Sequence, residues 1–192
     1  YEVYYHSILA DKPTIIFDSP TVSVETIILK HRIATTGFLF REKKHPRKIL
    51  SEKIGEYHIP HEQIAGIKNG NDFTTANGRI IPNSELTIDA PEPRSYAYCT
   101  DTAFTESFIE QIKGISVLYH ESTFAEEHKD RALETFHSTS KQAATIAKMA
   151  GVGKLIIGHF SARYENLQPL LNESREVFPE TYLAEEGKMF PI

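Results

Sequence analysis

The sequence is poor in cysteine: Cys99 is the one cysteine among 192 residues, so no disulfide can form within the chain. No apolar run approaches the roughly 18 residues that a membrane span needs, and no basic, apolar leader opens the sequence. An excess of positive charge is missing too, because the formal net charge is −5. We therefore expect a cytoplasmic protein with no membrane span and without an overall basic surface for nucleic acid.

The composition that remains, 40% hydrophobic and 24% charged, is typical of a protein that buries one sizeable core. The strand-like surroundings of Cys99 favour a buried, packing role for its thiol. The chain begins at Tyr1 rather than Met, and residues 1–8 already alternate like a strand. We therefore expect a fragment that forms one domain or a large part of one.

Hydrophobic periodicity predicts an α/β fold. Strands are expected over residues 1–8, 14–18, 22–31, 37–42, 95–99, 115–119 and 155–158. Helices are expected over residues 104–112, 123–136, 139–150 and 166–178. Two of these helices start with a capping-box pattern, Thr123 with Glu126 and Thr139 with Gln142. Alternation of helix and strand after residue 101 is the pattern of an α/β sheet.

The segment between residues 46 and 70 changes to a helical period and predicts two short helices separated by Pro60. Asn77-Gly78 then predicts a hairpin. A basic run precedes the helices and consists of Arg41, Lys43, Lys44, Arg47 and Lys48. Such a run can hold RNA phosphates whatever the net charge of the chain, although it is also compatible with a solvated helix start.

Polar side chains follow three of the apolar, strand-like segments: Asp101, His120 and His159. The carboxyl ends of strands are where α/β proteins build their sites, and carboxylate and imidazole groups are ordinary zinc ligands. They are candidates for a metal site, although an acid before a helix can be an N-cap and a strand-end histidine can be a core residue. His31 is a further strand-end histidine with the same two interpretations.

Three other residues suit phosphoryl chemistry. Glu121 can orient the imidazole of His137, as carboxylates orient catalytic histidines. Arg163 carries a planar guanidinium that can bind two phosphate oxygens at once.

Four separate motifs resemble the C-terminal half of the ribonuclease Z family. They are Cys99-Thr100-Asp101-Thr102, His120-Glu121-x-Thr123-Phe124, His137-Ser138-Thr139 and His159-Phe160-Ser161-x-Arg163-Tyr164. Lys30 to Ile33 with Gly37 to Glu42 is similar to a further metal-binding motif of that family. The resemblance implies a metallo-β-lactamase-like αββα sandwich, present here as its C-terminal half over residues 1–192, with a helical tRNA-binding arm inserted at 43–72.

The resemblance also implies an activity: zinc-dependent endonucleolytic removal of the 3′ trailer from precursor tRNA, by a homodimer with two zinc ions. His31, Asp101 and His159 would be metal ligands, and His137 would give a proton to the leaving oxygen, with Glu121 beside it. Substrate would be bound by Arg163 and, in the arm, by Lys43, Lys44, Arg47 and Lys48.

The sequence departs from this family in two places. The metal-binding motif His-x-His-x-Asp-His, which precedes this region in the family, is absent, so we expect an incomplete metal site and an inactive chain when it stands alone. The Gly-Pro step of the family's arm is replaced by Ile59-Pro60-His61. Two alternatives therefore stay open: another hydrolase of the same superfamily, such as a phosphodiesterase or an arylsulfatase-like enzyme, and a non-enzymatic RNA-binding half-domain.

Overall fold

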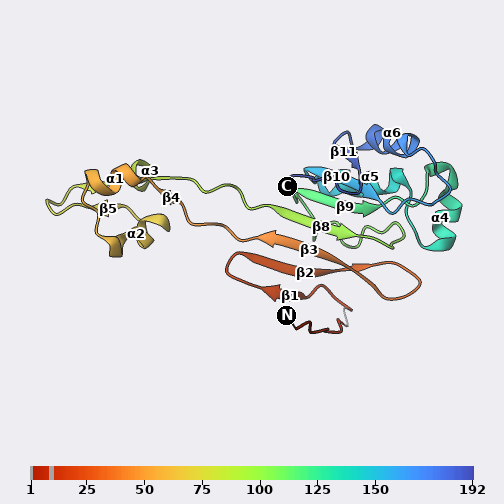
Figure 1. Ribbon diagram of the computed structural model, residues 1–192, viewed down its shortest axis with the longest axis horizontal. Helices are drawn as coiled ribbons and strands as arrows, with labels where there is room; N and C mark the ends of the chain where they lie inside the picture. The colour runs from red at the N-terminus through yellow and green to blue at the C-terminus, as the bar shows by residue number, and fades with distance from the viewer. Residues whose placement is uncertain (1, 9–10) are drawn as a thin grey trace. The chain divides into compact units, whose positions relative to one another are not determined.

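The computed structural model describes residues 2–8 and 11–192, and it divides the chain into two compact units. The first unit combines Tyr1–Glu42 with Arg94–Ile192, and the second is the intervening Lys43–Pro93 (Figure 1). The second unit begins where the inserted arm is expected but extends about 20 residues past position 72. The two units are described separately below.

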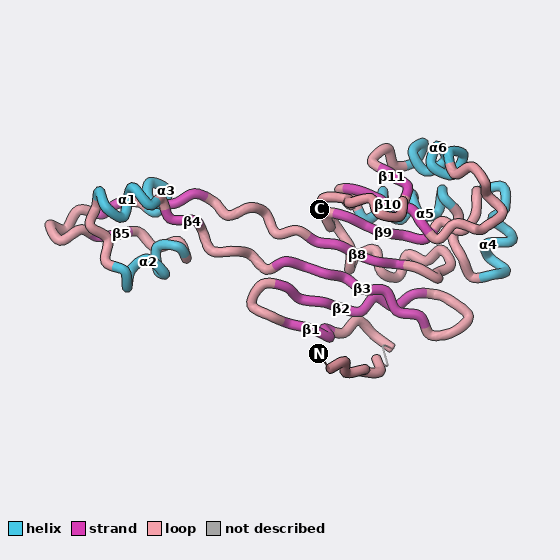
Figure 2. The backbone as a smooth tube through the Cα atoms, viewed as in Figure 1, coloured by secondary structure: helices cyan, strands magenta, loops and turns pink. Residues whose placement is uncertain are grey.

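One seven-stranded sheet organises the first unit (Figure 2). Its strands, in spatial order, are β1 (Ile15–Asp18), β2 (Val22–Leu29), β3 (Thr35–Glu42), β8 (Ser95–Cys99), β9 (Val117–Glu121), β10 (Lys154–Gly158) and β11 (Thr181–Leu183). The pairs from β1 to β8 are antiparallel, whereas β8, β9, β10 and β11 run parallel. The carboxyl ends of β8, β9 and β10 therefore lie along the same edge, and the site is built there.

Helices cover one face of this sheet. They are α5 (Ser140–Ala150), which packs on β9 and β10, and α6 (Gln168–Val177), which packs on α5 and β11; the 3-10 turn η1 (Glu126–His128) and α4 (Lys129–Thr135) precede α5 in the connection from β9. The apolar stripe of α5, with Ile146 at its centre, packs on Leu118 and Leu155 in the main core. The predicted capping box of Thr139 and Gln142 begins this helix, and Gly151 ends it with a φ of 62°. No helix in the described residues is both long and apolar enough to cross a bilayer.

The other face of the sheet is aromatic. The strand register aligns Phe40 with Tyr96 and places Tyr98 beside Tyr119, and the two pairs of rings stack with centroids 6.0 and 4.7 Å apart. These four side chains alternate along their strands with the buried core residues, as the period of a strand requires. None of the four is fully buried.

The second unit has a small core of its own. It consists of β4 (Lys48–Ile49), α1 (Ser51–Glu56), α2 (His61–Lys68), β5 (Phe73–Thr74), β6 (Ile80–Ile81), α3 (Asn83–Leu86) and β7 (Thr87–Ile88). Its buried apolar residues are Ile59, Ile67, Phe73, Ile81 and Leu86. The two predicted helices and the hairpin at Asn77-Gly78 are confirmed, with Gly78 at a φ of 81°.

Three local predictions are wrong. Residues 2–8 form no strand, because their side chains are exposed and they pair with no neighbouring strand, while Tyr1 lies outside the described residues. Of the apolar residues in the predicted helix over 104–112, Phe108, Ile109 and Ile112 are buried and Phe104 is partly buried, but the backbone forms no helix there and makes successive turns from residue 107 to 114. Thr123 caps no helix, since the following helical segment begins after Ala125, which makes no side-chain cap. For residues 104–112, the spacing of the apolar residues reflects their burial and does not require a helical backbone.

Candidate metal and proton-transfer site

Four side chains that could bind a metal meet at the carboxyl edge of the sheet. Asp101, Glu121, His137 and His159 each place one ligand atom within 4.8 Å of the others. Asp101 follows β8, Glu121 ends β9 and His159 follows β10, so three adjacent parallel strands each contribute one residue. His137 comes from the short connection between α4 and α5. Residues up to 58 positions apart in the sequence are therefore brought together by the parallel register.

The backbone is strained at two of these positions. Asp101 has a φ of 55° and His159 a φ of 59°, in the left-handed region that residues other than glycine seldom adopt. Strain of this kind is retained where the surrounding structure enforces it, and it concentrates at functional sites. Gly158, just before His159, is also constrained, because a Cβ at this position would clash with the Tyr119 hydroxyl. The chain is thus held in a tight turn that directs the His159 ring toward Asp101.

Asp101 and His159 form the accessible part of the site. Asp101 Oδ1 lies 3.2 Å from His159 Nε2, and the two side chains are 43% and 41% exposed. They offer one oxygen and one nitrogen donor, the donor set that zinc commonly accepts. These two residues fit a metal ion. A zinc site usually has four ligands, so further donors are required to complete it.

Glu121 is the buried centre of the cluster, with no exposed surface. Its Oε1 accepts hydrogen bonds from Thr102 N at 2.6 Å and from His137 Nδ1 at 2.9 Å. Its Oε2 accepts from Thr123 Oγ1 at 2.6 Å and from Ser138 N at 3.0 Å. Burial raises the pKa of Glu121, but these hydrogen bonds, led by that from His137, outweigh burial and lower the pKa. Glu121 is therefore a fully engaged carboxylate, better suited to orient its neighbours than to bind a metal.

His137 is the partner that Glu121 holds. The hydrogen bond to Glu121 raises the pKa of His137, and partial burial opposes it. Because Nδ1 donates to the carboxylate, Nε2 is the nitrogen left for other chemistry. The ring stacks on His159, with centroids 5.3 Å apart, and thus lies beside the two metal-ligand candidates.

His31 lies on another side of His137, with ring centroids 5.2 Å apart. Its Nδ1 is 3.0 Å from the carbonyl oxygen of Phe136, which can only accept, so the proton is on Nδ1 and Nε2 is free. Phe136 has a φ of 61°, which turns this carbonyl toward the histidine. His31 is not among the four residues whose ligand atoms converge within 4.8 Å. Its role as a metal ligand stays a prediction.

His120, the third strand-end candidate from the sequence, points into the core instead of the site. It is 1% exposed, stacks on Phe108, and its Nδ1 lies 2.7 Å from the carbonyl oxygen of Glu121. Burial lowers the pKa of His120, so the ring is neutral. The reason is the alternation of a strand: neighbouring residues face opposite sides of the sheet, so Glu121 and His120 cannot both face the site.

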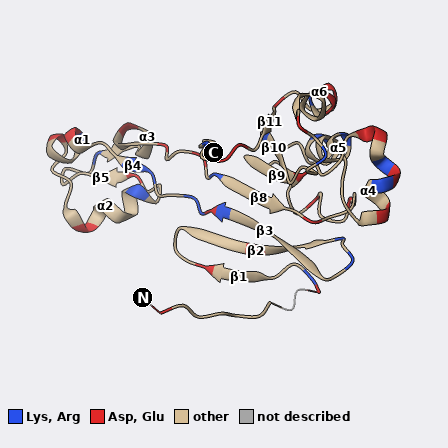
Figure 3. Cartoon of the chain, turned by 45° about the vertical axis from the view of Figure 1, so that its right-hand side comes forward, with Lys and Arg blue, Asp and Glu red and all other residues tan. Residues whose placement is uncertain are grey.

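The candidate substrate-binding residues belong to both units. Arg163 is exposed in the first unit, with its guanidinium 5.0 Å from the ring of Phe124. In the second unit, Lys44 and Lys48 are exposed, and Lys43 is half-buried. Figure 3 shows basic residues in the segment that joins β3 to β4.

Arg47 is occupied within its own unit. Its Nε donates to Thr87 Oγ1 at 2.6 Å, and its guanidinium pairs with Asp89. The sequence pattern alone does not distinguish this structural arginine from the exposed lysines beside it, because the partner residues lie about 40 positions away.

Sequence reasoning missed two hydroxyl groups of the site. Thr123 bonds Glu121 and lies 2.9 Å from His159 Nδ1, and Ser138 Oγ donates to the Thr102 carbonyl at 2.7 Å. The sequence spacing of Thr123 predicts a helix cap and gives no indication that this residue belongs to the cluster.

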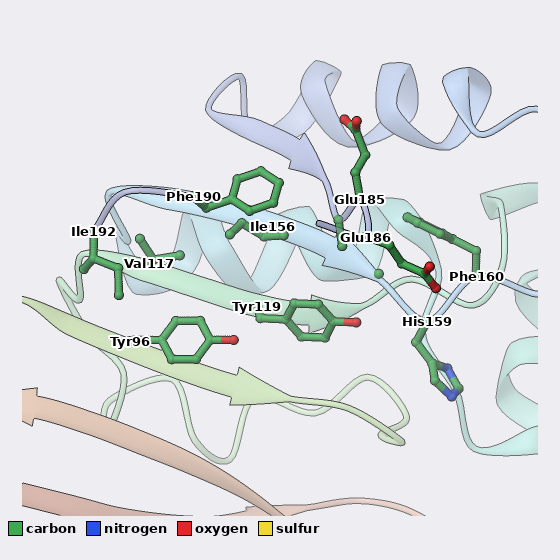
Figure 4. A pocket seen from close by; sticks show the side chains of 12 residues that line it. Tyr96, Val117, Tyr119, Ile156, His159, Phe160, Glu185, Glu186, Phe190 and Ile192 are labelled. Carbon is green, nitrogen blue, oxygen red and sulfur yellow. The ribbon is translucent and has the colours of Figure 1, made fainter. Parts of the chain in front are cut away.

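A pocket of about 580 Å³ opens beside His159 on the aromatic face of the sheet (Figure 4). Tyr96 and Tyr119 form its floor, and Phe160 and Phe190 line its sides. Glu185 and Glu186 also border it, so the pocket is apolar with an acidic margin. Of the metal-ligand candidates, His159 is the residue that lines this pocket.

Comparison with known proteins relates the whole chain to one group of enzymes. It is 47% identical over 192 residues to a protein named Ribonuclease Z from Bacteroides thetaiotaomicron, of which it covers 61%, and to one from Parabacteroides distasonis, of which it covers 63%. The chain thus spans about three fifths of the length of these curated relatives. No family model matches it.

Two solved structures show the fold. One is the metallo-β-lactamase fold protein YhfI from Bacillus subtilis, with a TM-score of 0.59 and 16% identity over 94% of this chain and 53% of YhfI. The other is the short form of human tRNase Z, with a TM-score of 0.55 and 22% identity over 94% of this chain and 48% of that structure. The chain is accordingly a homologue of the proteins named ribonuclease Z, similar to them along its whole length, and its fold is that of the metallo-β-lactamases.

Proposed function

We propose that this chain carries the C-terminal part of the active site of a metal-dependent endoribonuclease that removes the 3′ trailer from precursor tRNA. Similarity to ribonuclease Z over the whole chain supports the reaction class. The convergence of Asp101, Glu121, His137 and His159 at one sheet edge is the observation that carries the proposal. Zinc as the metal, a second metal ion, a homodimer and a cytoplasmic location belong to the same proposal.

Asp101 and His159 would hold the metal, because they are the accessible donors of the cluster. A bound divalent ion makes water a nucleophile at neutral pH and neutralises charge that gathers on the phosphate. His31 is proposed as a further ligand through its free Nε2. The remaining ligands would come from a region corresponding to the part of the relatives that this chain does not cover.

His137 would donate a proton from Nε2 to the leaving oxygen. Its raised pKa keeps the ring protonated closer to neutral pH than an ordinary histidine. Glu121 holds Nδ1 at 2.9 Å and so fixes which nitrogen faces the substrate. Arg163 is exposed near the site, beside Phe124, and its planar guanidinium would bind a phosphate oxygen.

The proposal is tested by a chimera, defined as the Bacteroides thetaiotaomicron relative with this chain in place of the matching region. We expect the purified chimera to bind a divalent ion and to release the 3′ trailer from precursor tRNA, and Asp101→Ala to lose both properties. The isolated 192-residue chain should hold metal weakly, because it supplies only part of a ligand set. A chimera that folds and binds tRNA without cleaving it would favour a non-enzymatic role.

A further inference from the structure

Thr123 Oγ1 lies between the two halves of the candidate site. It is 2.6 Å from Glu121 Oε2 and 2.9 Å from His159 Nδ1. The side chain is 7% exposed, so water does not compete freely for either contact. A hydroxyl has one proton, and it can donate that proton to only one of these two neighbours at a time.

The proton count around Glu121 decides which neighbour receives it. Backbone N–H groups of Thr102 and Ser138 point at the two carboxylate oxygens and can only donate. An oxygen that receives such donors is a carboxylate acceptor, so the Thr123 hydroxyl donates to Oε2. Thr123 Oγ1 then faces His159 Nδ1 with a lone pair, and this contact is a hydrogen bond only if Nδ1 carries a proton.

We propose that Thr123 is a positioning residue that holds His159 in the tautomer with its proton on Nδ1. The unprotonated Nε2 of the neutral ring then faces Asp101 Oδ1 at 3.2 Å, with its lone pair available for a metal ion. This inference rests on the proposed metal-binding role of His159. Glu121 then orients both histidines, because the same carboxylate contacts His137 directly and His159 through Thr123.

The arrangement of Asp101 and His159 is also suited to a cation. With the proton on Nδ1, two lone-pair-bearing atoms, Asp101 Oδ1 and His159 Nε2, face each other at 3.2 Å. Two such acceptors repel one another unless a proton, a water molecule or a metal ion lies between them. The left-handed backbone at both residues holds the two side chains facing each other, so the fold positions two donor atoms for a metal ion.

A role of Thr123 in helix capping does not explain these contacts. The residue has the sequence spacing of a cap, yet the next helical segment begins after Ala125 without a side-chain cap. Its hydroxyl makes both of its contacts inside the cluster. Thr123→Val keeps the shape of the side chain and removes only the hydroxyl, whereas Thr123→Ser keeps the hydroxyl.

Nitrogen-15 NMR of the 192-residue chain without metal tests the tautomer directly. At about pH 8, where an ordinary histidine is neutral, two-bond proton–nitrogen correlations distinguish Nδ1–H from Nε2–H rings. The His159 signals are assigned by their loss in His159→Gln. We expect the Nδ1–H pattern in the wild type, a shift toward Nε2–H in Thr123→Val, and restoration in Thr123→Ser. An Nε2–H pattern in the wild type overturns the proposal even if the Val variant fails to fold.

Metal affinity provides the second readout. In zinc competition with a chromophoric chelator, we expect Thr123→Val to bind zinc about 10-fold more weakly than the wild type. We expect Thr123→Ser to recover the wild-type zinc affinity. Ser161→Ala is the matched control, because this nearby hydroxyl accepts from Arg163 Nε at 3.3 Å and does not touch the His159 ring. Equal affinities in the wild type and Thr123→Val would overturn the positioning role.

The two proposals fail in distinguishable ways. If His159 shows the Nδ1–H pattern and its dependence on Thr123, but the chimera neither binds metal nor cleaves precursor tRNA, the proposed function is wrong and the tautomer assignment stands. If the chimera is active and His159 shows the same tautomer in the wild type and in Thr123→Val, the function stands and the role of Thr123 is wrong.

Discussion

His137 Nδ1 lies 2.9 Å from Glu121 Oε1, so a partly buried imidazole is tied to a carboxylate that is closed off from solvent. Charge on the ring is stabilised by this carboxylate, and neutralising either partner leaves the other buried without its counterpart. The pair can therefore supply a proton from the opposite nitrogen of the ring without first rotating it.

The first prediction concerns this pair. In the chimera, His137→Ala should lower kcat by about 10²- to 10⁴-fold and leave metal content unchanged, because a proton donor acts in the transition state. Metal analysis of the purified variant and single-turnover cleavage of precursor tRNA separate the two effects. Loss of the metal from His137→Ala would make this residue a ligand instead of a proton donor.

A second prediction separates the ligand role of Asp101 from its backbone strain. Both Asp101→Ala and Asp101→Gly should abolish metal retention and cleavage together. The metal-free Gly variant should nevertheless be more stable than the Ala variant by roughly 1 kcal/mol, because glycine tolerates the φ of 55° at this position. Urea unfolding of the two metal-free chains measures the difference, and equal midpoints would mean that the turn relaxes when the carboxylate is removed.

The third prediction concerns alkaline stability. Burial raises the pKa of Tyr96 from 10.0 to about 12. The folded chain therefore keeps its phenol proton where the unfolded chain has already released it, so this contribution to stability is present below pH 10 and is lost as the pH rises toward 12. The free energy of unfolding of Tyr96→Phe should fall less steeply over this range than that of the wild type.

Tyr5→Phe is the matched control for Tyr96→Phe. Tyr5 is 93% exposed, so its removal should leave the slope of stability against pH unchanged. If the free energy of unfolding has the same slope against pH in the wild type and in Tyr96→Phe, the aromatic face of the sheet is open to water at Tyr96.

Much of the fold follows from periodicity, and the exceptions have physical causes. The strands β8, β9 and β10 are predictable because buried β-branched and aromatic runs are a local signal, although β9 continues past the predicted end at Tyr119 to Glu121. So is α5, whose cap and apolar stripe agree. The turns over residues 107–114 were not predictable, because apolar spacing reports burial and does not specify the backbone conformation.

The site is partly predictable for a related reason. Asp101 and His159 stand where strands end, so the sheet topology brings them together without further information. The contacts of Thr123 depend on the side chains of Glu121, at the end of β9, and His159, just after β10, and no local pattern encodes that meeting. His120 illustrates the converse case: it was expected just after a strand ending at Tyr119, but it lies within β9, where the alternation of faces sends it to the core.

The last prediction concerns substrate recognition by the second unit. Lys44 and Lys48 are exposed, whereas Arg47 is held by Thr87 and Asp89. In the chimera, Lys44→Ala with Lys48→Ala should weaken precursor-tRNA binding and lower the slope of log K against log salt by roughly one for each phosphate that is no longer bound. Binding measured over a series of salt concentrations checks this.

Lys53→Ala is the matched control, since Lys53 lies in the same unit and already pairs with Glu56 at 2.7 Å; its salt slope should stay that of the wild type. Hydrolysis of a small phosphodiester should be the same in the chimera and in the variant lacking Lys44 and Lys48, because a metal site requires one phosphate whereas selection of a folded tRNA requires contacts away from the scissile bond. A fall in small-substrate turnover as large as the fall in tRNA processing would make the second unit part of the catalytic scaffold. That result would favour another hydrolase of the metallo-β-lactamase superfamily, one that does not select its substrate through an RNA-binding arm.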